Sequence, residues 1–178
     1  MPLKLRIVPD PVLRKTAKAL SAMDKETARF MNEMLETMYE SRGIGLAAPQ
    51  VGELKRVIVM DVADEQKTGQ ALLMANPEVL WKSEETFTYK EGCLSIPDQF
   101  AEVTRPKRVK VGYIDADGKR REIELEDLAS SCVQHEIDHL NGVLFVDYVS
   151  KLKRDMMLKR VEKMQRMAEE EARGGKAF

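Results

Sequence analysis

The sequence is poor in the residues that most often carry cross-links or metal sites. Its 178 residues include two cysteines, two histidines and one tryptophan. Two cysteines exclude a disulfide-rich scaffold, and in a reducing compartment we expect Cys93 and Cys132 to be free thiols, ligands or buried residues. The chain has no apolar run near the roughly 20 residues that a membrane-spanning helix needs, and its N-terminus has no secretory hydrophobic region. We therefore expect a cytoplasmic protein with no membrane partner.

The sequence also lacks an excess of charge of either sign. Its net charge is −1, although 33% of its residues are charged. A protein that binds DNA through its overall charge is usually strongly basic, so we expect no DNA partner. The length and the ordinary apolar content predict one domain with a sizeable core.

Helical spacing of apolar residues predicts three helices, at about residues 21–41, 127–140 and 150–172. The first carries a stripe of methionines, which we interpret as core packing. Ser21 is its predicted N-cap, since the acidic Asp24 follows three residues later as in a capping box. The third helix is basic along its first two-thirds.

Period-two alternation and runs of β-branched residues predict a largely antiparallel sheet without a strand–helix–strand rhythm. Three prolines make residues 1–20 an irregular arm. Asp117-Gly118 is a predicted hairpin turn. The predicted strands are 56–62, 71–80 with an interruption at Asn76-Pro77, 86–90, 108–114 and 121–125. Gly43–Gln50 reads as a tight turn in which the backbone can approach a ligand.

Both histidines lie in one segment, Gln134–Leu140, four residues apart. On a helix, His135 and His139 share a face and can bind one metal ion, while the adjacent Glu136 can handle protons. The predicted class is therefore α+β, with antiparallel strands packed around a central metal-binding helix, plus an N-terminal helix and a C-terminal helix.

Two histidines leave the third ligand open. A metzincin-type third histidine is excluded, because Phe145 occupies that position. Glu162 would complete a metallopeptidase site, but it lies in a basic helix. Cys132 is three residues before His135 and should point near the metal, but its more plausible role is that of a small buried packing residue. Cys93 lies in a short proline-terminated segment that can present a thiolate to the helix, and it is the favoured ligand.

Three segments together resemble those of peptide deformylases of the bacterial type with a C-terminal helix. They are Gly43–Gln50 (GIGLAAPQ), Glu91–Ser95 (EGCLS) and Gln134–His139 (QHEIDH), in the family's order and spacing. Smaller matches at Pro9–Arg14 and Leu144–Tyr148 extend the resemblance over nearly the whole chain. The family removes the formyl group from the N-terminal formyl-methionine of nascent polypeptides.

The resemblance implies the roles of the central residues. Cys93, His135 and His139 would hold one divalent metal ion per chain, Fe²⁺ in the cell, with Zn²⁺, Ni²⁺ or Co²⁺ able to substitute. Glu136 would be the general base. The side-chain amide of Gln50 and the backbone N–H of Leu94 would stabilise the oxyanion.

The resemblance also implies a substrate site. Arg105 would hold a substrate carbonyl or brace Glu91. Ser131 and Asp98 depart from the family pattern, which leaves the side-chain preference open. The predicted substrate-binding residues are Gly43, Ile44, Gly45, Tyr89, Glu91, Gly92, Arg105, Leu128, Ser131 and Cys132.

The basic C-terminal helix suggests that the chain has a catalytic part and a separate helical extension. We expect residues 1–150 to form the catalytic metallohydrolase part and residues 151–178 a basic helical extension of the same domain. In bacterial relatives this helix docks on the ribosome, which makes residues 151–166 a predicted ribosome contact. Two other functions stay open: a metallopeptidase that uses Glu162, and a non-catalytic, ribosome-associated module with a structural metal and Cys132 as fourth ligand.

Overall fold

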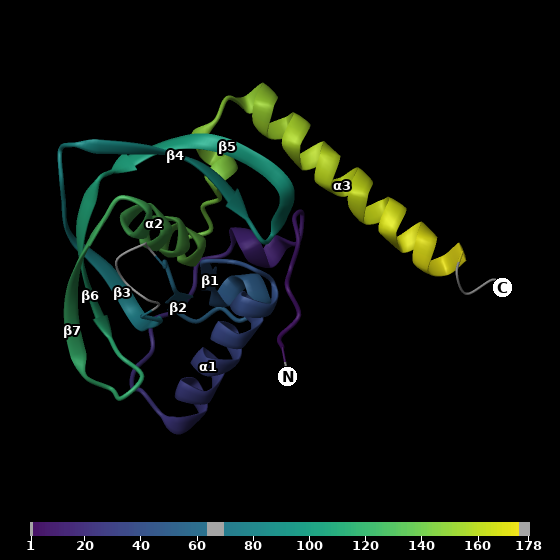
Figure 1. Cartoon of the computed structure of the whole chain (residues 1–178). Coiled ribbons are helices and arrows are strands. Elements are labelled where there is room, and N and C mark those ends of the chain that lie inside the picture. The colour runs from purple at the N-terminus through teal and green to yellow at the C-terminus, as the bar shows by residue number, and fades with distance from the viewer. Residues whose placement is uncertain (1, 64–69, 175–178) are drawn as a thin grey trace.

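The computed structural model describes residues 2–63 and 70–174, and it confirms the α+β class (Figure 1). Its α-helices are α1 (Lys25–Glu40), α2 (Leu128–Leu140) and α3 (Lys151–Gly174). Its strands are β1 (Gly45–Ala47), β2 (Val57–Met60), β3 (Leu72–Lys82), β4 (Thr86–Cys93), β5 (Ile96–Pro106), β6 (Arg108–Ile114) and β7 (Arg120–Glu126). Three short 3-10 helices connect them, namely η1 (Pro11–Arg14), η2 (Ala48–Val51) and η3 (Phe145–Tyr148).

The strands form two antiparallel sheets. One has five strands in the order β1-β2-β3-β6-β7, and the other is the β4-β5 hairpin. Figure 1 shows α2 in the middle of the molecule, with the five-stranded sheet on one side and the hairpin across another. The predicted central helix is thus enclosed by strands, as we expected.

Strand β2 explains how the core is built around α2. All four of its residues are buried, because each face of the strand packs on a different helix. Ile58 and Met60 pack in one cluster with Val133 and Leu140 of α2. Val57 and Val59 pack in another with the methionines of α1. The methionine stripe of α1 is therefore core packing. Helix α2 is held in position by its packing on β2.

The predicted N-cap of the first helix is wrong. Helix α1 begins at Lys25, and its N-cap is Asp24, whose carboxylate accepts a hydrogen bond of 2.7 Å from the backbone N–H of Thr27. Aspartate caps as well as serine does, and Asp24 is adjacent to the first helical residue, whereas Ser21 is exposed and lies outside the helix.

Two strand predictions also need correction. Strand β3 continues through Asn76-Pro77, where the chain forms an irregularity in register instead of a break. Asn76 has a positive φ of 47° there, and its side-chain amide bonds both the N–H and the carbonyl of Leu20. Strand β1 occupies residues that read as a turn, and it pairs with β2.

Strand β5 was not predicted at all. From Gln99 to Arg105 every second residue is buried, and two of these buried residues, Gln99 and Arg105, are polar. Two buried polar residues and the early Pro97 hide the period-two apolar signal. The predicted strand 86–90 is the outer part of β4, which pairs with β5 along its whole length.

Helix α3 extends away from the body of the protein (Figure 1). Only Met157 and Val161 of this helix are buried. They pack with Ile96 and Val103 of β5 and with Phe145 of η3. Among residues 2–63 and 70–174, the helices are all too short or too polar to cross a membrane.

Candidate metal centre

Cys93, His135 and His139 meet at one point in the structure. One ligand atom from each lies within 4.8 Å of the others. The Sγ atom of Cys93 is 3.4 Å from Nε2 of His139, and the two imidazole rings are 5.0 Å apart at their centroids. His135 and His139 lie four residues apart on α2 and are buried, so the helix presents both rings on one face.

The β4-β5 hairpin brings Cys93 to this helix. Cys93 pairs with Ile96 at the closed end of the hairpin, and the register shifts between Glu91 and Cys93. A shift of this kind re-aims a side chain relative to the regular pleat. Gly92 sits at the shift, where an added Cβ would lie 2.6 Å from the ring of Phe100. A side chain at position 92 would therefore require the half-exposed ring of Phe100 to move.

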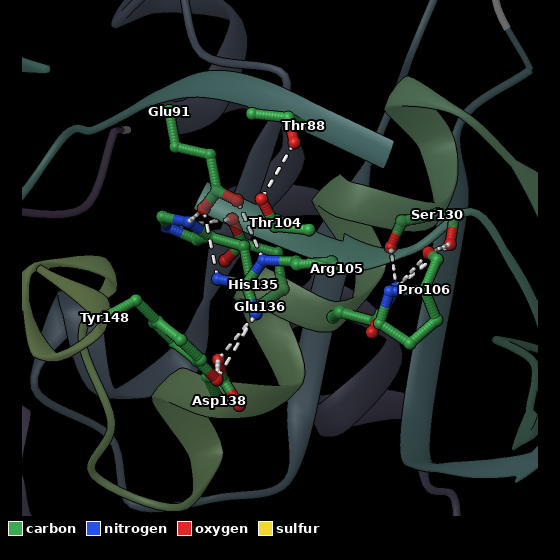
Figure 2. Close-up of polar contacts among 11 residues, drawn as sticks. Thr88, Glu91, Thr104, Arg105, Pro106, Ser130, His135, Glu136, Asp138 and Tyr148 are labelled. Carbon is green, nitrogen blue, oxygen red and sulfur yellow. Dashed lines mark hydrogen bonds and ion pairs between the residues drawn. The ribbon is translucent and has the colours of Figure 1, made fainter. Parts of the chain in front are cut away.

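A buried ionic network fixes the orientation of His135 (Figure 2). Nδ1 of His135 lies 2.8 Å from Oε1 of Glu91, which leaves Nε2 to face the metal position. Arg105 donates two hydrogen bonds to Glu91, at 2.8 and 3.0 Å, and one of 2.8 Å to Asp138. The hydroxyl of Tyr148 donates to the same Asp138 oxygen at 2.7 Å.

This network sets the ionisation of Glu91. Burial alone would raise the pKa of Glu91, but the hydrogen bonds from His135 and Arg105 outweigh burial and hold that pKa below its ordinary value. Glu91 is therefore a carboxylate, which accepts a hydrogen bond from Nδ1–H of His135. Such an outer partner fixes the tautomer and the direction of a metal-binding imidazole.

Glu136 occupies a different environment from Glu91. It is buried, and burial raises its pKa to about 7. Its Oε1 lies 4.0 Å from Nε2 of His135. Its Oε2 has no hydrogen-bond partner among the residues that the structure describes. A carboxyl group with a pKa near neutrality and a free oxygen can both accept and return a proton.

Gln50 reaches the site from η2. Its Oε1 accepts a hydrogen bond of 2.9 Å from the N–H of Ala47, which fixes the orientation of the amide. Its Nε2 then points to Ser95 Oγ at 3.1 Å and to Cys93 Sγ at 3.4 Å. The amide thus offers a donor beside the metal position, and Ser95, which the sequence did not single out, holds it there.

A cavity of about 470 Å³ opens beside these residues, and most predicted substrate-binding residues line it. Arg105 is the exception, because its guanidinium lies in the buried network behind His135. The predicted residues found in the lining are Gly43, Ile44, Gly45, Tyr89, Glu91, Gly92, Leu128, Ser131 and Cys132, together with Gln50, Cys93, Leu94, His135 and Glu136.

Sequence reasoning missed the far wall of this cavity. Arg42 precedes the Gly43–Gly45 segment, and Lys90, Pro97, Gln99 and Phe100 flank the hairpin turn beside Asp98, which the resemblance had already marked as a departure. Phe100 is 56% exposed, which is unusual for a phenylalanine beside a cavity. Recognition of β5 as the partner of β4 would have placed these residues next to Cys93, because a hairpin brings the two sides of its turn together.

The residues fit a divalent transition metal. A thiolate and two imidazoles are a known set for such ions, and three protein ligands leave a position for water or substrate. Glu162 lies on the exposed part of α3, and neither it nor Cys132 belongs to the cluster of candidate ligands found in the described part of the chain. The thiol of Cys132 instead lies 3.7 Å from the carbonyl of Ile44.

Comparison with known proteins gives one consistent family. A family model described as polypeptide deformylase matches residues 2–155. The chain is 51% identical to the peptide deformylase of Methylocella silvestris, over 96% of this chain and 89% of that protein. It is also 51% identical to that of Rhizobium meliloti, over 98% and 97%.

Solved structures show the same fold. The crystal structure of peptide deformylase from Ehrlichia chaffeensis is similar to this chain with a TM-score of 0.91 and 37% identity, over 94% of this chain and 99% of that one. A structure of peptide deformylase from the same organism in complex with actinonin has a TM-score of 0.90 and 38% identity, over 93% and 98%.

Proposed function

Because this chain belongs to the polypeptide deformylase family, we propose how its own residues carry out the reaction. The chain is a metal-dependent peptide deformylase, an enzyme that removes the formyl group from the N-terminal formyl-methionine of nascent polypeptides. The observation that carries this function is the meeting of Cys93, His135 and His139 at the wall of a cavity.

The three ligands come from two elements, the β4-β5 hairpin and α2. A divalent metal held by them supplies a Lewis acid, which lowers the pKa of water and polarises a carbonyl group. We propose Fe²⁺ as the ion in the cell, with Zn²⁺, Ni²⁺ or Co²⁺ able to replace it, since a thiolate with imidazoles suits all four. Elemental analysis of protein purified without oxygen tests this choice, and a protein that carries only zinc under those conditions would contradict it.

Glu136 is the proposed general base. Its unpartnered Oε2 accepts a proton from the attacking water, and the pKa of about 7 lets the same oxygen return that proton to the departing amine. The C–N bond of the formamide breaks, and the products are formate and a free N-terminus. Gln50 Nε2 and the backbone N–H of Leu94 are the proposed donors to the oxyanion, because both residues adjoin Cys93.

The substrate is proposed to bind along β1. This strand pairs with β2 on one side only, so its other edge can accept the backbone of an extended peptide. Gly45 faces Glu136 and Cys132 there. The methionine side chain would enter the cavity near Ile44, Tyr89 and the first turns of α2. Arg105 is proposed to support Glu91 rather than to contact the peptide.

The decisive experiment is anaerobic turnover of formyl-Met-Ala and of its acetylated twin. Formate release with little acetate release is expected, because the space beside the ligands is proposed to admit only the smallest acyl group. Equal rates would contradict a site shaped for formyl. Release of neither acid by metal-loaded protein would contradict the function itself.

We also propose that residues 151–178 form a basic extension of the catalytic part, residues 1–150, and contact the ribosome in the cytoplasm. Exposed lysines and arginines along the first two-thirds of α3 support this contact. Deleting α3 would also remove buried Met157 and Val161, so charge reversal is the cleaner test. Lys153→Glu, Arg160→Glu and Lys163→Glu together should abolish co-sedimentation with ribosomes at low salt.

The control is a triple variant at exposed lysines elsewhere, Lys25→Glu, Lys82→Glu and Lys119→Glu, which changes the net charge equally. If both triple variants co-sediment alike, α3 is an ordinary solvated helix. Turnover of a short formylated peptide should be the same in both.

A further inference from the structure

The first turns of α2 continue the wall of the catalytic cavity away from the metal position. Leu128, Ser131, Cys132 and His135 follow each other at helical spacing and all line the cavity. In the pose proposed above, the substrate side chain next to the formyl group would lie beside Ser131, one turn before His135. Ser131 is 2% exposed.

The hydroxyl of Ser131 is not committed to the protein. Its Oγ is buried and has no hydrogen-bond partner among residues 2–63 and 70–174. The neighbouring Ser130 is as deeply buried, but its hydroxyl has two partners. It donates to the carbonyl of Pro106 at 2.9 Å (Figure 2). It also accepts a hydrogen bond of 2.9 Å from Nε2 of Gln134. Ser130 is also absent from the cavity lining.

A buried hydroxyl without a partner costs stability, so it is expected to have a partner when the site is filled. Leu128 is apolar, and the thiol of Cys132 is a weak donor that lies against the carbonyl of Ile44. On the α2 wall of the cavity, all of which the structure describes, Ser131 is thus the hydroxyl that has no protein partner. Its Oγ is covered in this structure, so it reaches a bound side chain by rotation about the Cα–Cβ bond.

Resting on the proposed function, we propose that Ser131 donates a hydrogen bond to the first side chain of the substrate, so that the enzyme also deformylates chains that begin with oxidised methionine. The sulfur of methionine is only a weak acceptor. Its sulfoxide carries a polar oxygen on a side chain only one atom larger. The hydroxyl of Ser131 satisfies that oxygen, which an apolar wall would leave buried and unpaired.

The reaction itself is unchanged. Water adds to the formyl carbon, the C–N bond breaks, and the products are formate and a peptide whose N-terminal residue is still the sulfoxide. No oxidant or reductant takes part. Because Ser131 is fixed on a helix, its hydroxyl lies on one side of the bound sulfur, and the two sulfoxide epimers should be distinguished.

The test measures formate release from three peptides: each epimer of formyl-methionine-sulfoxide-Ala, and formyl-norleucine-Ala, which has no polar atom in its side chain. The wild type should prefer one epimer by about tenfold, in line with the loss when a buried polar group is left unpaired. In Ser131→Ala, kcat/KM for that epimer should fall about tenfold relative to kcat/KM for the norleucine peptide. This variant should also release formate from the two epimers at equal rates. Ser130→Ala should keep the wild-type ratios.

Thermal melting provides a second readout. Ser131→Ala should melt no lower than the wild type, because it removes an unpaired hydroxyl, whereas Ser130→Ala should melt lower. If Ser131→Ala has the same kcat/KM ratios between the peptides as the wild type, the proposal is wrong. If wild-type protein releases formate from none of these peptides, the proposed function has failed. Binding would still test the role of Ser131 in that case. One sulfoxide epimer should raise the melting temperature of the wild type more than the other, and this difference should be lost in Ser131→Ala.

Discussion

His135 and Glu91 lie 2.8 Å apart through Nδ1 and Oε1, although they come from different elements and 44 positions separate them in the chain. Glu91 is held in turn by Arg105, which also bonds Asp138. The guanidinium of Arg105 stacks over the ring of Tyr148 at 4.7 Å. The direction of one metal ligand is therefore set by a chain of contacts that ends at the half-exposed Tyr148.

The first prediction concerns this contact. Glu91→Gln should weaken metal binding by about 10- to 100-fold, the usual effect of losing an outer partner of a ligand. Competition with a chelator of known affinity measures the change. The matched control is Glu102→Gln on the exposed side of β5. Equal affinities in the two variants would show that Glu91 does not orient His135.

Glu136→Gln should separate metal binding from chemistry. The amide keeps the size of the side chain but cannot take a proton. We expect wild-type metal content by mass spectrometry and a fall in kcat of about 10²- to 10⁴-fold. A variant that keeps most of its activity would remove Glu136 from the role of base.

The two cysteines should behave differently. Cys93→Ala should lose the metal, because Cys93 is part of the ligand cluster, whereas Cys132→Ala should retain it. Glu162→Ala should change neither metal content nor rate. Metal loss in Cys132→Ala with retention in Cys93→Ala would instead support a structural site with Cys132 as a ligand.

Gly45→Ala tests the close approach of β1 to α2. The new methyl group would lie 2.7 Å from Glu136 Oε1 and 2.8 Å from Cys132 Sγ, so these two buried side chains, or the backbone that carries them, must shift. We expect a loss of about 1–3 kcal/mol in the free energy of unfolding and a large fall in activity. Gly174→Ala is the control, since an added Cβ there meets nothing within 4 Å. An unaltered denaturation midpoint for Gly45→Ala would contradict this packing.

Acid stability should depend on Asp147. Burial alone would raise its pKa, but hydrogen bonds from Arg14 and from the Leu144 N–H outweigh burial and lower it. The stabilisation is therefore present above the unfolded-state pKa of about 4 and is lost as the pH falls through the lower folded-state pKa.

Asp147→Asn should then lose about 1 kcal/mol or less in the free energy of unfolding at pH 7, since Arg14 is 45% exposed. The difference from the wild type should vanish towards pH 2. Urea denaturation at several pH values measures it. Asp155→Asn, at an exposed position on α3 with no ion pair in the described part of the chain, is the control. A difference that grows on acidification would contradict the sign.

Local signals in the sequence predicted most of the framework and the ligand-bearing helix. Helix α2 and strand β6 were predictable because each carries an uninterrupted pattern of its own. His135 and His139 needed only helical spacing, whereas Cys93 as third ligand was favoured before the resemblance and depended on context.

Long-range contacts were the part that local patterns missed. Strand β5 was not predicted because Gln99 and Arg105 occupy inward positions that usually hold apolar residues. Arg105 is buried only because Glu91 and Asp138 meet it there, and no short stretch of sequence contains all three. The cap at Asp24 was missed for a smaller reason, namely that several residues before α1 can cap a helix.

The three candidate ligands come from two separate elements, so an ion bound by them would link the β4-β5 hairpin to α2. Cys93 belongs to the β4-β5 hairpin, while both histidines belong to a helix that is buried in the core. The free energy of binding an ion at these ligands would then also stabilise the packing of the hairpin on α2. Affinity for the ion and the local stability of the β4-β5 hairpin are therefore one linked quantity, and whatever loosens the hairpin, including a change at its contact with α3, also loosens the ion.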